Sequence, residues 1–127
     1  MKTGKPFQFS FRKFIKSFIY AFSGIKEVFY QEQNFKVHTL AAILAVLLGF
    51  LLRIAPWEWC FLAVVIGLVL SAEMANTAIE KLCDVTEPNQ NEIIRVVKDV
   101  SAGMVLVCAI AALAVGIIIF LPKLLGL

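Results

Sequence analysis

The sequence predicts an all-α integral membrane protein with three transmembrane helices and an N-terminal amphipathic surface helix. Of its 127 residues, 61% are hydrophobic and 17% are charged, and the mean hydropathy is +0.88. A soluble domain carries about 25% charged residues, and so short a chain has too little interior to bury this many apolar side chains. Three apolar stretches, at residues 37–54, 59–82 and 100–121, approach the ~20 residues that cross a bilayer as a helix.

The segment before the first stretch, residues 1–36, is predicted to be an arm that carries the amphipathic helix. Its apolar residues recur at three- and four-residue steps, with lysines between them: Phe11, Phe14, Ile15, Phe18, Ile19, Phe22, Ile25 and Phe29, with Lys13, Lys16 and Lys26. This pattern is typical of a helix that lies in the membrane interface with its basic side chains toward anionic headgroups. A soluble helix that packs on a partner protein is the alternative. Residues 37–127 are predicted to form one transmembrane domain.

The two connections between the spans differ in character. In the first, Pro56 is expected to end a helix, and Trp57 and Trp59 suit the headgroup region. The second, residues 84–99, is polar throughout, and we expect a working loop there. Cys60, Cys83 and Cys108 are scattered and set among apolar residues, which predicts buried thiols and no disulfide framework.

Orientation follows from the basic residues. Seven of the twelve Lys and Arg residues precede the first span: Lys2, Lys5, Arg12, Lys13, Lys16, Lys26 and Lys36. Because cationic segments stay in the cytosol, we expect the N-terminus and residues 84–99 to be cytoplasmic and the C-terminus to lie outside, with Lys123 as an exception. A net charge of +3 is too small to indicate nucleic acid as a partner.

The second span contains polar residues where lipid would favour apolar ones. Asn76, Thr77, Glu80 and Asp84 all fall within about 60° of Glu73 around a helix, and so form one stripe with it. The stripe climbs roughly 16 Å from the hydrocarbon toward the cytoplasmic surface. Charged groups at membrane depth cost several kcal/mol and usually mark a functional site. We therefore interpret the stripe as a site.

These residue types suit phosphoryl transfer. Glu80, near the interface, can hold a hard divalent cation through oxygen, and the deeper Glu73 suits a general base that takes a proton from a hydroxyl dissolved in the bilayer. Asn76 can orient a carboxylate. Lys98 and Asp99 begin the third span at the same level, where a lysine supplies a point charge for phosphate, and Glu32 could complete the metal site. The chain contains no P-loop, no HRD/DFG set and no GxGxxG sequence.

The same residues closely resemble the signature of the prokaryotic integral-membrane diacylglycerol kinase and undecaprenol kinase family. The matching strings are Glu73-Met-Ala-Asn-Thr-Ala-Ile-Glu80 with Asp84, Lys98-Asp99-Val-Ser-Ala-Gly103, Ala21-Phe-Ser-Gly24 and Gln31-Glu32-Gln-Asn-Phe35. The resemblance extends over about residues 9–121. It implies a lipid kinase in the prokaryotic cytoplasmic (inner) membrane, a homotrimeric bundle of three-span protomers. Mg²⁺-ATP is then expected at the cytoplasmic interface, in a site shared between neighbouring subunits.

The resemblance also assigns roles residue by residue. Glu73 is the catalytic base, Glu32 and Glu80 bind the metal, and Asn76 and Asp84 shape the site. ATP is contacted by Lys13, Tyr20, Glu32, Glu80, Asn89, Gln90, Asn91, Lys98 and Asp99, and the lipid by Glu73, Lys36 and His38. Lys13, with Arg12 beside it, stands where the best-known diacylglycerol kinases have an arginine, so either residue could contact ATP. His38 is more typical of the undecaprenol kinases and slightly favours a polyprenol over diacylglycerol, although it could be only a polar residue at the start of a helix.

Two other classes compete with the kinase. A small oligomeric proton-coupled transporter needs one buried carboxylate and would explain Glu73 alone. In a non-catalytic assembly subunit, the stripe would only bind a partner helix. Neither explains why Glu80, Asp84, Lys98 and Asp99 gather with Glu32 at one membrane face.

Overall fold

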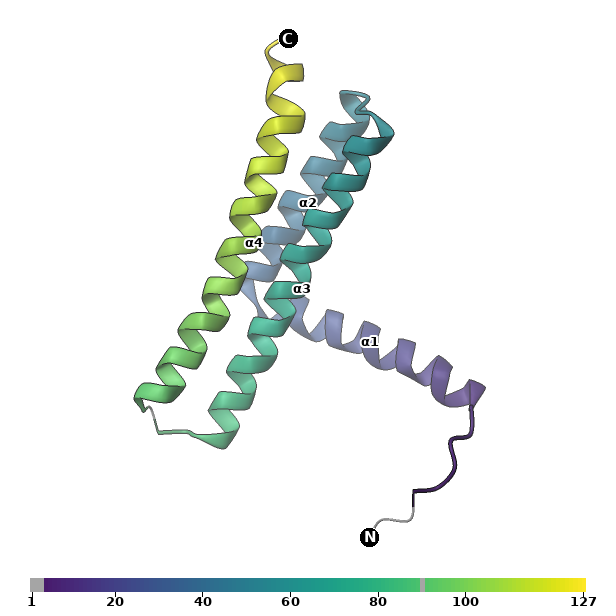
Figure 1. Cartoon of the computed structure of the whole chain (residues 1–127), viewed down its shortest axis with the longest axis vertical. Coiled ribbons are helices and arrows are strands. Elements are labelled where there is room, and N and C mark those ends of the chain that lie inside the picture. Colours follow the sequence, from purple (N-terminus) through teal and green to yellow (C-terminus); the bar gives the residue numbers. More distant parts are fainter. Residues whose placement is uncertain (1–3, 90) are drawn as a thin grey trace.

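The computed structural model describes residues 4–89 and 91–127, which form four helices and no strand. They are α1 (Phe11–Gln31), α2 (Gln33–Leu51), α3 (Pro56–Thr86) and α4 (Glu92–Leu124). The last three run alongside one another, and α1 leaves them at a steep angle (Figure 1). The predicted all-α class is confirmed, because α2, α3 and α4 are each long and apolar enough to cross a membrane.

The surface helix α1 begins and ends at defined caps. The Ser10 side chain accepts a hydrogen bond from the backbone N–H of Lys13 at 3.3 Å, which satisfies one of the free donors of the first turn. Further along, the rings of Phe14 and Phe18 pack edge to face with their centroids 5.2 Å apart. A single extended residue, Glu32, separates the end of α1 from the start of α2. The chain therefore changes direction at Glu32.

The turn from α2 to α3 is tight. The N–H of Arg53 donates to the carbonyl of Phe50 at 3.3 Å, and that of Ile54 donates to the carbonyl of Gly49 at 3.1 Å. This is the Schellman arrangement, and Arg53 occupies its left-handed position with a φ of 51°, where glycine is usual. Gly49 allows close packing, because a Cβ atom there would lie 2.7 Å from Cη2 of Trp59.

Pro56 begins a helix, contrary to the expectation that it ends one. It lies in the first turn of α3, where a backbone N–H has no partner within the helix and the fixed φ of proline is already helical. The preceding turn is closed by Arg53 and not by the proline.

The prediction of a loop over residues 84–99 is wrong. α3 continues to Thr86 and α4 begins at Glu92, so Asp84 and Asp99 are both helical. With 31 and 33 residues, the two helices are about 46 and 50 Å long, well beyond the ~30 Å of the hydrocarbon core. The helical hairpin that they form extends past the junction of α1 with α2 (Figure 1).

The core lies along α3, which packs against both α2 and α4. Ile54, Leu62, Ile119 and Phe120 form its buried cluster, near the α2–α3 turn. Beside this cluster, Lys123 Nζ lies 2.7 Å from Oε2 of Glu58, which is 5% exposed. Lys123, the expected exception to the orientation rule, is therefore neutralised within the chain.

Candidate active site

The centre of the polar stripe is Glu73, which is 3% exposed although it carries a carboxylate. Its Oε1 lies 3.3 Å from Nε2 of His38 on α2. Among the described residues this is the one ion-pair partner of Glu73. The sequence singled out both residues, but it did not predict this contact between them.

Two further members of the stripe are engaged in hydrogen bonds, one within α3 and one between α3 and α4. The hydroxyl of Thr77 donates to the backbone carbonyl of Glu73 at 3.0 Å, and the hydroxyl of Ser101 on α4 donates to Oδ1 of Asn76 at 2.7 Å. Thr77 and Ser101 are buried, and Asn76 is half-buried. Asn76 thus joins α3 to α4 one turn from Glu73, a contact that suits its expected site-shaping role.

At the outer end of the stripe, acidic and basic side chains form pairs. Lys98 Nζ lies 2.7 Å from Oδ1 of Asp84, which joins α4 to α3. Asp99 is 2.7 Å from Nη1 of Arg95, and Arg95 also pairs with Glu92. Sequence reasoning missed Arg95, although its spacing of three and four residues from the two carboxylates is a recognised signal.

Glu32 and Glu80 share one membrane level. The contact between His38 and Glu73 fixes the register of α2 against α3. From there, six residues back leads to Glu32 and seven residues on leads to Glu80. Because α2 and α3 are antiparallel, both steps lead in the same direction.

This donor set fits Mg²⁺. Residues 4–89 and 91–127 contain no group of three or more His, Cys, Asp or Glu side chains arranged to hold a metal ion. Mg²⁺, however, is commonly bound by one or two carboxylates, with substrate phosphates and water completing the coordination. Glu32 and Glu80 would supply those carboxylates.

The remaining expected ATP and lipid contacts are dispersed within one chain. Lys13 and Tyr20 are exposed on α1, whose start lies far from the three long helices (Figure 1). Asn91 caps α4, because its Oδ1 accepts a hydrogen bond from the N–H of Ile94 at 2.9 Å, and Asn89 is exposed. Lys36 Nζ reaches the carbonyl of Tyr30 at 3.4 Å. Gln90 lies outside the described residues.

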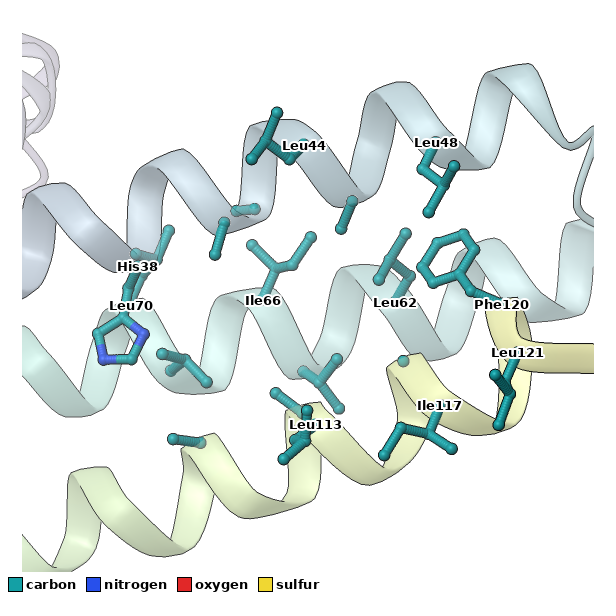
Figure 2. Close-up of a pocket in the computed structure, with 18 of the residues that line it drawn as sticks. His38, Leu44, Leu48, Leu62, Ile66, Leu70, Leu113, Ile117, Phe120 and Leu121 are labelled. Atoms are coloured by element: carbon teal, nitrogen blue, oxygen red, sulfur yellow. The ribbon is translucent and has the colours of Figure 1, made fainter. Parts of the chain in front are cut away.

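An apolar groove of about 540 Å³ leads away from His38 between α2, α3 and α4. Its walls are almost entirely aliphatic. In Figure 2, His38 and Leu70 lie at one end, and Phe120 and Leu121 lie at the other. Since His38 also contacts Glu73, the groove joins the stripe to the interior of the membrane.

A buried carboxylate next to an apolar groove, within three helices long and apolar enough to cross a membrane, is the arrangement expected of a small α-helical membrane enzyme that acts on a lipid. Residues 19–120 match the prokaryotic diacylglycerol kinase family. The chain belongs to this family and is a membrane lipid kinase. The comparisons give no support to the transporter alternative.

Two relatives cover most of the chain. The undecaprenol kinase of Bacillus subtilis (strain 168) is 38% identical over 112 residues, which are 88% of this chain and 91% of that protein. The diacylglycerol kinase of Synechocystis sp. (strain ATCC 27184 / PCC 6803 / Kazusa) is 37% identical over 112 residues, which are 87% of this chain but 64% of that protein.

Proposed function

We propose that this lipid kinase transfers the γ-phosphate of ATP to the hydroxyl of undecaprenol, giving undecaprenyl phosphate. The observation that carries the proposal is the contact of the buried Glu73 with His38, which lines one end of the apolar groove. A lipid whose tail lies in the groove would bring its hydroxyl to this carboxylate.

In the proposed reaction Glu73 is the general base. Its carboxylate takes the proton of the lipid hydroxyl as the hydroxyl oxygen attacks the γ-phosphorus of ATP. The bond from that phosphorus to the bridging oxygen breaks, and ADP leaves with the electron pair. Burial suits this role, because a base shielded from solvent meets a membrane-dissolved hydroxyl with little competition from water.

ATP is proposed to bind at the outer end of the stripe. Glu32 and Glu80 would hold Mg²⁺, which neutralises charge on the phosphates. Lys98 would give its positive charge to a phosphate, with Lys13, Tyr20, Asp99 and the connection between α3 and α4 as further contacts. The cap bond of Asn91 occupies only its oxygen, so its amide nitrogen remains available to ATP.

Undecaprenol is preferred over diacylglycerol because of two observations. A histidine at position 38 resembles the undecaprenol kinases more than the diacylglycerol kinases. The Bacillus subtilis undecaprenol kinase also aligns over 91% of its own length. The two substrates both offer a primary hydroxyl at the interface, so diacylglycerol is the alternative. Competition between them at equal mole fraction in micelles of purified enzyme should favour undecaprenol, and a preference for diacylglycerol would reverse the assignment.

The proposal includes the surroundings of the enzyme. In this proposal the enzyme lies in the prokaryotic cytoplasmic membrane as a homotrimer with shared active sites. Residues 1–36 are its cytoplasmic arm, and residues 37–127 are the kinase domain. In a shared site, Lys13 and Tyr20 of one subunit would contact the ATP whose Mg²⁺ is held by the carboxylates of the next subunit. Mixing inactive Glu73→Gln subunits with inactive Lys13→Ala/Tyr20→Phe subunits then restores part of the activity, whereas separate sites give no recovery.

The groove offers a direct test of the activity. Gly116 lines it, and a Cβ atom at Gly116 meets nothing within 4 Å. Gly116→Leu should therefore fold, occupy part of the groove and raise the KM for the lipid by roughly tenfold, with nucleotide affinity unchanged. Gly67→Leu is the matched control, because Gly67 is equally open but lies outside the groove. The assay is ATP consumption that depends on added lipid and magnesium. No lipid dependence, or equal effects of the two variants, would contradict the proposal.

A further inference from the structure

The contact between His38 and Glu73 joins two helices at the most buried carboxylate of the stripe. The Glu73 side chain is 4% exposed and that of His38 is 27% exposed, with 3.3 Å between Nε2 and Oε1. For this contact to be attractive while Glu73 is ionised, Nε2 must carry a hydrogen, because a carboxylate only accepts. The contact engages Oε1 of Glu73, and no ion pair or hydrogen bond engages Oε2 among the described residues.

The neighbours of Glu73 do not provide this donor. The hydroxyl of Thr77 donates to the backbone carbonyl of Glu73 and not to its carboxylate. Asn76 accepts a hydrogen bond from Ser101 through its oxygen, and no hydrogen bond joins its amide nitrogen to the Glu73 carboxylate among the described residues. A glutamate side chain has several rotatable bonds and loses considerable freedom when it is fixed in one orientation. The residue that fixes it, among those described, is His38.

We propose that His38 is a positioning residue, which holds Oε1 of Glu73 through Nε2 so that the second carboxylate oxygen faces the lipid hydroxyl. This inference rests on the proposed function, in which Glu73 takes the hydroxyl proton. It replaces the expectation that His38 binds the lipid directly. The effect of His38 on the reaction then passes through Glu73.

Three variants of His38 and its neighbour separate the two roles. His38→Leu removes the donor and keeps an apolar wall for the groove. It should lower kcat by about 10–100-fold, as expected when a reacting group is misplaced, with the lipid KM close to that of the parent. His38→Gln retains an N–H donor and should recover most of kcat. Thr39→Val is the control, because the Thr39 hydroxyl donates only to the Phe35 carbonyl on the same helix.

A double-mutant cycle with Glu73→Gln tests whether His38 acts through Glu73 or on the lipid. If His38 acts through Glu73, His38→Leu has little further effect in the Glu73→Gln background, because the carboxylate that it orients is gone. Additive losses, or a raised lipid KM with unchanged kcat, would mean that His38 acts on the lipid and would overturn the inference while leaving the proposed function intact. Full turnover by Glu73→Gln alone would overturn both. Activities are compared per assembled protein, so that misfolding is not mistaken for lost positioning.

Discussion

Lys123 and Glu58 neutralise each other at the end of the bundle that lies opposite the carboxylate stripe. Lys123 Nζ is 2.9 and 2.7 Å from the two carboxylate oxygens of Glu58, and it also donates to the carbonyl of Ile119 at 3.4 Å. Glu58 in turn accepts from the N–H of Ala55 at 3.0 Å. The pair ties the first turn of α3 to the last turn of α4.

We expect the loss of either charge to destabilise the protein. Lys123→Met leaves the Glu58 carboxylate buried without a cation, and Glu58→Gln leaves the ammonium without an anion while keeping the Ala55 bond. Uncompensated buried charge is costly, whereas replacing both partners by neutral groups is often well tolerated. Melting temperatures in one detergent should therefore fall for each single variant and recover in Glu58→Gln/Lys123→Met. Single variants that melt like the parent would show that the pair contributes nothing.

Glu73→Gln should lose turnover by roughly 10²–10⁴-fold, the usual effect of removing a general base. ATP affinity should change little, because Glu80 lies two helical turns away. Stability should hold or rise, since a carboxylate at membrane depth is itself costly and Gln carries no charge. Turnover per assembled oligomer, nucleotide affinity and melting temperature are measured on one preparation. A purely structural Glu73 predicts lost stability, with normal activity in the molecules that do assemble.

Glu80→Gln and Glu32→Gln should abolish magnesium-dependent nucleotide binding while the fold survives. Each substitution keeps the size of the side chain and removes the charge that a hard cation requires. Binding of ATP is measured by calorimetry as magnesium is varied. Glu27→Gln serves as the control, because Glu27 is an exposed carboxylate on α1 with no assigned role. Near-normal affinity in either test variant would show that the metal assignment is incorrect.

Chemical labelling tests the proposed orientation. In a background with the three native cysteines replaced, a cysteine at Asn89 should react from the cytoplasmic side and one at Leu127 from the outside. Leu127 is the better terminal site, because Gly126 has a φ of 74° that a cysteine would adopt only with strain. Membrane-impermeant maleimide on intact and inverted vesicles gives the readout. The reverse pattern would put the carboxylates on the side without ATP.

Arg53→Gly should stabilise the protein by about 0.5–1 kcal/mol. The left-handed conformation strains a residue with a Cβ by about 1–2 kcal/mol, and the greater freedom of glycine in the unfolded chain offsets part of the gain. Arg53→Ala is the control, since it removes the charge but keeps the Cβ atom. Melting temperatures are compared in one detergent. Equal shifts for the two variants would attribute the effect to charge and not to backbone strain.

The helices were largely predictable because their signals are local. Composition and apolar length indicated three spans, and the spacing of Phe14, Phe18 and their neighbours indicated α1. The polarity of residues 84–99 predicts a loop, but most of this segment is helical, because outside the bilayer a helix no longer needs apolar side chains. Polarity there marks the membrane boundary, while α3 itself continues to Thr86 and α4 begins at Glu92 after the Asn91 cap.

The contacts across helices were not predictable. Periodicity shows that Glu73, Asn76 and Glu80 share one face of α3, but it does not show which residue of another helix faces them. His38 and Glu73 are 35 positions apart, and Glu58 and Lys123 are 65 positions apart. Such pairs depend on the register in which antiparallel helices pack, and that register is set by the Schellman turn and by aliphatic packing along α3.

The one-residue junction at Glu32 makes the protein sensitive to membrane thickness. α2 has 19 residues, a length of about 28 Å, between an amphipathic helix that follows the interface and a tight turn at the far side. This fixed span is close to the ~30 Å of an average hydrocarbon core, and neither end has slack. A thicker bilayer must thin around the protein or pull α1 inward, and Glu32 moves with α1. Lipids of different chain length should therefore alter the depth of Glu32 in the membrane, and with it the proposed metal site, although no residue is substituted.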